Sequence, residues 1–135
     1  MMNVVVSISL LMIFAFGTDG LRRQEQPVVS QNKFFCNVKA LTPTERADHK
    51  ELTAKLLAER KESVETPTGY EFQFNPKSVS LAELADWVTA ESKCCSFLDF
   101  HIDVEAEGNL LCLRLTGAQG VKDFIRSEFA VKNGR

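Results

Sequence analysis

The hydrophobic pattern of the chain changes its period within residues 91–100, ESKCCSFLDF. Upstream of the cysteines, apolar residues recur at helical spacing, at Leu81, Leu84, Ala85, Val88 and Cys95. Downstream, Leu98, Phe100, Ile102 and Val104 alternate with Asp99, His101, Asp103 and Glu105. Such alternation is typical of a half-buried strand. The adjacent cysteines therefore lie at a helix-to-strand junction, where the backbone can expose a side chain.

Before this junction, the sequence predicts a strand, a helix and a hairpin. The strand is expected at residues 34–41 and the helix at residues 43–60, where Thr42 and Glu45 form a capping box with proline at the first helical position. The hairpin is expected at residues 63–74, around a proline–threonine–glycine turn. The N-terminal half is therefore expected to be β-α-β-β.

The second half is expected to contain two strands between two helices. Ser80 and Glu83 form a second capping box, which opens the helix that ends at the cysteines. The strand after the cysteines turns at residues 107–109 into a last strand, and a helix follows at residues 121–131. The order β-α-β-β-α-β-β-α predicts an α+β fold with a single antiparallel sheet and helices on one face. Its first six elements match a ferredoxin-like sandwich.

Periodicity also assigns side chains to the core. The rows expected to face inward are Tyr70, Phe72 and Phe74, then Leu111, Leu113 and Leu115, together with Trp87. The first helix is expected to turn inward a stripe of Ala47, Ala54, Leu57 and Ala58, with Leu52 and Leu56 beside it. His49 falls on the charged side of the first helix, where a solvated surface histidine is expected.

Length and charge limit the classes of function. A chain of 135 residues suffices for one domain with a hydrophobic core, and 44% hydrophobic with 25% charged residues is ordinary for a globular protein. The net charge of −2 offers no basic surface for nucleic acid. No pair of acid and base residues is placed well enough to predict an enzyme.

The first residues are typical of an export signal. Residues 4–17 carry no charge but are too few to span a bilayer, and small residues precede a cleavage site after Gly17. We expect a signal peptide at residues 1–17, a polar leader at residues 18–32 and a single domain at residues 33–130. The protein would then be periplasmic or extracellular. It would contact a membrane only if the apolar segment stayed uncleaved as an anchor.

The four cysteines of an exported chain allow three pairings into two disulfides. The hairpin centred near residues 107–108 places Cys112 opposite Ile102 or Asp103, on the order of 25 Å along the strands from Cys94 and Cys95. A disulfide needs Cα atoms within about 7 Å, so Cys112 is expected to be a free thiol. Cys36 remains available to pair with either of the adjacent cysteines.

Glu91, Cys94 and Cys95 are expected on one face of the helix end, because Glu91 precedes the cysteines by three and four residues. With Cys36 they make a mixed sulfur–oxygen ligand set for a soft or borderline metal ion. The alternative is a surface Glu91 that pairs with a lysine.

The reactivity of the two adjacent thiols follows from their neighbours. The hairpin register places residues 117–120, where the last helix begins, beside Cys94 and Cys95. A helix N-terminus and Lys93 would lower a thiol pKa, whereas Glu91 would raise it. Because Cys95 continues the inward row of the helix, we expect Cys95 to be more buried and Cys94 to react first.

The pattern Glu91-x-x-Cys94-Cys95-Ser96-Phe97-x-x-Phe100 resembles a small family of uncharacterised bacterial domains that carry a Glu-x-x-Cys-Cys-(Pro/Ser)-Phe-x-x-Phe motif. The resemblance extends from Cys36, which precedes the capping box, to about residue 129. It implies one domain with a cysteine-centred site and no established activity.

Two functions follow from these observations. In the first, the thiols bind a soft metal or metalloid ion, or exchange disulfides with a thiol partner. In the second, the chain is a structural or partner-binding domain stapled by a disulfide from Cys36 to Cys94 or Cys95.

Overall fold

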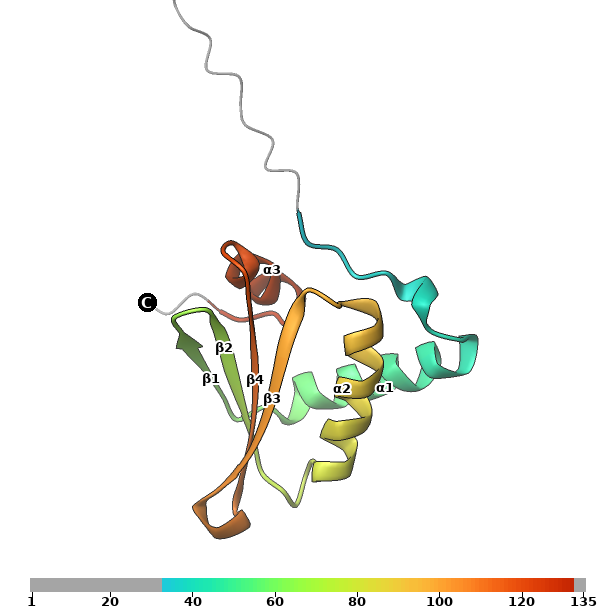
Figure 1. Cartoon of the computed structure of the whole chain (residues 1–135). Coiled ribbons are helices and arrows are strands. Elements are labelled where there is room, and N and C mark those ends of the chain that lie inside the picture. The colour runs from blue at the N-terminus through green and yellow to red at the C-terminus, as the bar shows by residue number, and fades with distance from the viewer. Residues whose placement is uncertain (1–32, 133–135) are drawn as a thin grey trace, which may run out of the picture.

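A computed structural model of the chain describes residues 33–132 (Figure 1). The predicted signal peptide and leader, residues 1–17 and 18–32, lie outside the described residues. Within residues 33–132, no helix combines the length and the apolar character needed to cross a membrane.

The helices and strands alternate as the capping boxes and hairpin turns predict. In chain order they are η1 (Val38–Ala40), α1 (Pro43–Glu59), β1 (Glu62–Thr66), β2 (Gly69–Phe74), α2 (Leu81–Cys94), β3 (Leu98–Glu105), η2 (Ala106–Gly108), β4 (Leu110–Gly117) and α3 (Val121–Glu128), where η is a 3-10 helix. Both predicted capping boxes are present: Thr42 caps α1 with Glu45, and Ser80 caps α2 with Glu83.

The four strands form one antiparallel sheet in the order β1-β2-β4-β3. β2 and β3 are both antiparallel to β4, so they run parallel to each other with β4 between them and α2 as their connection. This arrangement is a split β-α-β unit. The predicted α+β class with a single antiparallel sheet is confirmed, and the element order is broadly that of a ferredoxin-like sandwich.

The predicted first strand, residues 34–41, is wrong. Residues 34–37 form no strand, and Val38–Ala40 is a 3-10 turn. The central position between β2 and β3 is filled by β4. The segment is instead fastened to the end of α2, where the Asn37 N–H donates to the Cys94 carbonyl oxygen at 2.7 Å. A disulfide between Cys36 and Cys95 adds a covalent link.

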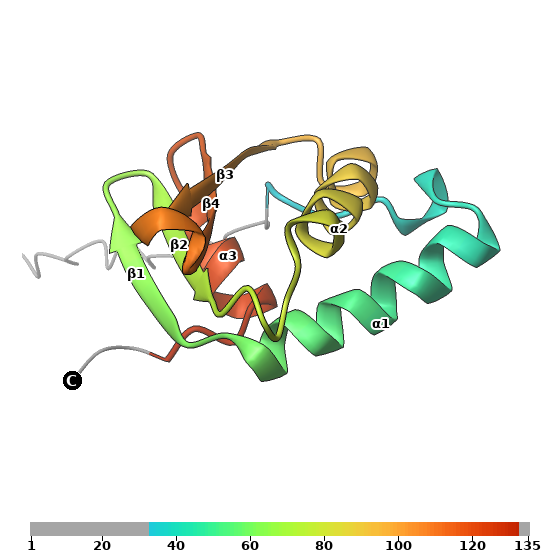
Figure 2. The same ribbon diagram turned by 90° about the horizontal axis from the view of Figure 1, so that it is seen from below.

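The helices lie on one side of the sheet (Figure 2). The buried rows on this face are the predicted ones: Tyr70, Phe72 and Phe74 of β2, and Leu111, Leu113 and Leu115 of β4. Trp87 of α2 is buried, as predicted, and its ring lies 5.6 Å edge-on from that of Phe129, at the end of α3. Phe72 also packs against Phe129, so α2, α3 and β2 share one core.

The hairpins have the expected register. Asp103 lies opposite Cys112, one of the two residues predicted for that position. Gly69, at the start of β2, lies so close to β4 that a Cβ atom would be 1.8 Å from the Leu115 carbonyl oxygen. Only glycine fits at that position, because the obstacle is backbone.

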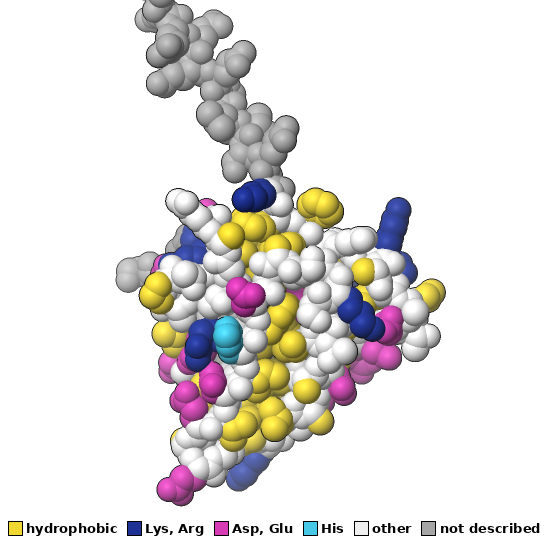
Figure 3. Space-filling model, viewed as in Figure 1, with side chains coloured by type: hydrophobic (Ala, Val, Ile, Leu, Met, Phe, Trp, Pro, Cys, Tyr) yellow, Lys and Arg dark blue, Asp and Glu magenta, His cyan; other side chains and the backbone are white. Residues whose placement is uncertain are grey.

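β3 is an edge strand with the predicted half-buried pattern. Leu98 is buried, Phe100 and Ile102 are half-buried, and Val104 is 53% exposed. Figure 3 shows a band of hydrophobic side chains running down this side of the molecule.

The buried face of α1 differs from the predicted alanine stripe. Ala47, Ala54 and Ala58 are exposed, whereas Leu56 is buried. A methyl group contributes little buried area, so the larger side chains decide which face of the helix turns inward. Because the leucine face of α1 turns inward instead of the alanine stripe, His49 is directed toward α2.

Candidate functional site

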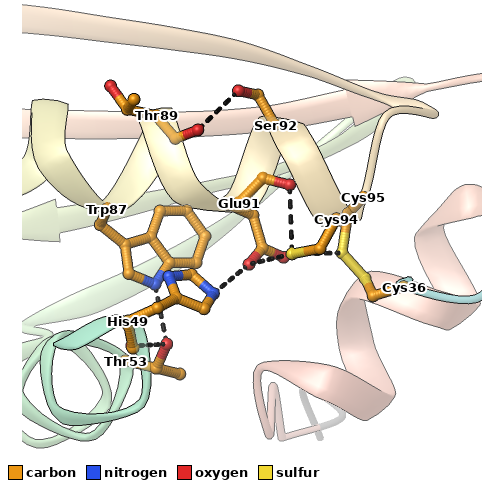
Figure 4. Close-up of polar contacts among 9 residues, drawn as sticks. All are labelled: Cys36, His49, Thr53, Trp87, Thr89, Glu91, Ser92, Cys94 and Cys95. Atoms are coloured by element: carbon orange, nitrogen blue, oxygen red, sulfur yellow. Dashed lines mark hydrogen bonds and ion pairs between the residues drawn. A yellow bond between two sulfur atoms is a disulfide. The ribbon is translucent and has the colours of Figure 1, made fainter. Parts of the chain in front are cut away.

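The structure brings together the four residues predicted as a ligand set. Cys36 comes from the segment before η1, Glu91 and Cys94 from the last turn of α2, and Cys95 from the residue that caps it. Their donor atoms all lie within 4.8 Å of one another. Figure 4 shows these side chains converging at the end of α2. The site is therefore a cluster of three sulfurs and one carboxylate, called below the cysteine cluster.

The end of α2 sets the geometry of the cluster. The Cys95 N–H donates to the Glu91 carbonyl oxygen at 2.7 Å, and the backbone then leaves the helix at φ −114° and ψ 59°. Cys94 and Cys95 therefore project from the last turn and the cap of the helix, with their Sγ atoms 3.9 Å apart.

Cys36 and Cys95 are oxidised to a disulfide. Their Cα atoms lie 4.5 Å apart and are separated by 59 residues in sequence. The disulfide of the structural alternative, from Cys36 to Cys94 or Cys95, is thus formed with Cys95. Cys94 and Cys112 are the free cysteines, and the prediction of a free Cys112 is confirmed.

Cys94 is more buried than the partly exposed thiol predicted from the sequence. Its side chain is 5% exposed and that of Cys95 is 0% exposed, so the predicted order of burial is confirmed but both are buried. Burial, and secondly the Glu91 carboxylate, raise the pKa of the Cys94 thiol to about 11. The described side-chain contacts of Cys94 Sγ are with Glu91 and Cys95, and none is with the start of the last helix.

His49 is part of the site, and the prediction of a solvated surface histidine is wrong. Its Nε2 lies 2.6 Å from Oε2 of Glu91, and its ring stacks on Trp87 with centroids 5.6 Å apart. The Trp87 indole N–H donates to Thr53 Oγ1 at 2.9 Å, and the Thr53 hydroxyl donates to the His49 carbonyl oxygen at 2.7 Å. These contacts hold the imidazole between α1 and α2, beside the cysteine cluster (Figure 4).

One signal in the sequence could have located His49. It lies three and four residues before Leu52 and Thr53, and seven before Leu56, so these side chains share one helix face. The alanine stripe predicted for the first helix pointed to a different face of that helix. Glu91 also does not pair with a lysine, which was the alternative: its partner is His49.

A groove between α1 and α2 reaches His49 from the solvent. Its volume is about 390 Å³, and its lining residues are Glu45, Asp48, His49, Leu52, Asp86, Thr89, Ala90 and Lys93. At its edge Lys93 Nζ pairs with Glu45 Oε1 at 2.6 Å, so Lys93 points away from the sulfurs. Lys93 was expected to stabilise the Cys94 thiolate, but none of the described side-chain contacts of Cys94 is with Lys93.

Comparisons of the chain with protein-family models, curated proteins and solved structures found no match. The chemistry of the site is therefore inferred from its geometry. Three sulfurs and a carboxylate can bind a thiophilic ion when the disulfide is reduced. When it is oxidised, the disulfide links the N-terminal segment to α2.

Proposed function

We propose that the reduced protein binds a thiophilic metal or metalloid ion through Cys36, Cys94, Cys95 and Glu91. The observation that carries this proposal is the convergence of their four donor atoms within 4.8 Å. Two sulfur ligands of one tetrahedral ion, each about 2.3 Å from it, lie about 3.8 Å apart. The Sγ atoms of Cys94 and Cys95 are separated by 3.9 Å. Adjacent cysteines at this helix end can therefore reach one ion without a large rearrangement.

The disulfide makes this function dependent on redox state. Cys36 and Cys95 cannot serve as thiolate ligands while they are bonded to each other. Reduction by an external thiol supplies both sulfurs, and oxidation removes them.

A second candidate function is structural. The Cys36–Cys95 disulfide closes a segment of 59 residues that contains α1, β1, β2 and α2. Such a link favours a stapled, partner-binding domain in an oxidising compartment, which agrees with the export signal predicted at residues 1–17. In this role Glu91 and Cys94 would be parts of the core.

A thiol count followed by a metal titration separates these functions. In denaturant, we expect two reactive thiols without reductant and four after reduction. The reduced, refolded protein is then titrated with Cd²⁺ without oxygen, and the ultraviolet sulfur-to-cadmium charge-transfer band is recorded. We expect one Cd²⁺ per chain, at least about tenfold weaker binding for Cys94→Ser, and unchanged binding for the matched control Cys112→Ser. A folded, reduced protein that binds neither Cd²⁺ nor arsenite would reject the ion site and leave the structural role.

A further inference from the structure

The cysteine cluster lies in a region with little positive charge. Cys94, Cys95 and Glu91 are 5%, 0% and 6% exposed. Within residues 33–132, His49 is the one basic side chain with a polar contact to the cluster, and it is engaged by Glu91 at 2.6 Å. Lys93 is directed to Glu45 instead. A further negative charge in the cluster would therefore have no cation to pair with.

The atoms around Cys94 Sγ also disfavour added negative charge. Its oxygen hydrogen-bond partners are the Glu91 carbonyl oxygen at 3.4 Å and the Glu91 carboxylate oxygen at 3.8 Å. Both carry negative partial charge. A buried charge without a partner is costly, so a complex of ion and thiolates is most stable here when its net charge is zero.

Counting charges then distinguishes the classes of ion. A divalent ion with three thiolates leaves a net charge of −1, and with Glu91 as a fourth ligand it leaves −2. A divalent ion with two thiolates is neutral but leaves one of the three sulfurs unused. A trivalent ion with three thiolates is neutral and leaves Glu91 with His49. As(III) and Sb(III) form such pyramidal complexes, with a lone pair where a fourth ligand would be.

We propose that the ion bound by the reduced site is a trivalent metalloid, As(III) or Sb(III), held by Cys36, Cys94 and Cys95. This inference rests on the proposed function, because it names the class of ion for the same site. Glu91 and His49 then stay paired with each other beside the complex rather than serving as ligands.

The binding step balances without oxidation or reduction of the metalloid. Arsenous acid, As(OH)₃, exchanges its three As–O bonds for three As–S bonds, and each thiol proton leaves with a hydroxide as water. Three water molecules form, and arsenic stays trivalent. A thiol or phosphine reductant must first donate two electrons to the Cys36–Cys95 disulfide, which yields the two additional thiols.

Native mass spectrometry of the full chain tests the stoichiometry. The protein is reduced with a phosphine, separated from it without oxygen, and mixed with arsenite. We expect a one-to-one adduct whose mass gain is one arsenic atom minus three hydrogens, since each As–S bond removes one thiol hydrogen. Loss of only two hydrogens would overturn the proposal, because it would mean two sulfur ligands.

Competition with Cd²⁺ separates this inference from the proposed function. The Cd²⁺-loaded protein should lose its charge-transfer band when equimolar arsenite is added. Retention of Cd²⁺ under excess arsenite would overturn the metalloid assignment and keep the ion site, whereas binding of neither ion would reject both. Cys36→Ser and Cys94→Ser should each weaken arsenite binding at least about tenfold, and Cys112→Ser should not. Should a variant fail to fold, the competition in the unsubstituted chain decides.

Discussion

Cys94 and Cys112 are both buried free thiols, yet only Cys94 belongs to a candidate site. The pKa of each is raised to about 11. Cys94 has the Cys95 sulfur at 3.9 Å and shares its cluster with Cys36. Cys112 instead lies on β4 between Gln73 and Asp103, on the sheet face opposite the helices. The difference shows that burial and a raised pKa do not define a thiol site, whereas convergence of donor atoms does.

The same pKa shift also has different sources at the two cysteines. Burial is the largest cause at both positions. The second cause is Glu91 at Cys94 and Glu71 at Cys112, where Glu105 and Asp103 contribute further. Cys112 is therefore subject to the carboxylates of the exposed sheet face, and Cys94 to a single buried carboxylate.

The cysteine cluster and the surroundings of Cys112 should differ most in how much they contribute to the free energy of unfolding. Cys95→Ala removes a disulfide that closes 59 residues, and chain entropy predicts a loss of about 4 kcal/mol in the free energy of unfolding. Cys112→Ala should cost about 1 kcal/mol, the effect of a small cavity. Urea denaturation measures both. Adding reductant should destabilise the unsubstituted protein and the Cys112 variant but not the Cys95 variant. An equal response in all three would contradict a structural disulfide.

Alkylation of the folded, oxidised protein should be slow at both free thiols. A pKa near 11 in place of the ordinary 9.0 leaves about 100-fold less thiolate at neutral pH. Peptide mapping after iodoacetamide treatment gives the two rates. Glu91→Gln should accelerate Cys94 alone, and Glu71→Gln should accelerate Cys112 alone. If either substitution accelerated both thiols, a general loosening of the fold would be the better explanation.

The contact between His49 and Glu91 beside Cys94 should contribute less to stability than the disulfide. His49→Ala leaves the Glu91 carboxylate buried without its partner, and we expect a loss of about 2 kcal/mol in the free energy of unfolding. The matched control is Lys93→Ala, which removes an exposed pair with Glu45 and should have a smaller effect. Thermal and urea denaturation would show this order, and a larger loss for the lysine variant would refute it.

The smallest expected effect is a decline of stability at alkaline pH. Cys94 and Cys112 keep their protons in the folded protein to about pH 11, whereas unfolded thiols lose them near 9.0. Between these values the folded state binds more protons, so raising the pH favours unfolding. Each thiol should contribute about 1 kcal/mol after allowance for solvent screening. Replacing either one by alanine should flatten the curve between pH 9 and 11, and no change in slope would speak against the raised pKa values.

Local chemistry determined a large part of this fold from sequence alone. The capping boxes at Thr42 and Ser80, the inward rows of β2 and β4 and the pairing of Asp103 with Cys112 all depend on residues a few positions apart or on one short turn. The same reasoning placed Cys95 deeper than Cys94, because helical periodicity extends to the last turn.

Only the tertiary structure decided the contacts that make the site. His49 and Glu91 are separated by 42 residues, and Cys36 and Cys95 by 59, so no local pattern specifies either contact. The rotation of α1 about its axis brings His49 to α2, and the docking of residues 34–37 on α2 replaces the predicted first strand. The raised pKa of Cys94 follows from the same packing, since burial is its largest cause. Periodicity identified the inward rows of β2 and β4 but not the inward face of α1, and packing between distant elements decides what the inward side chains contact.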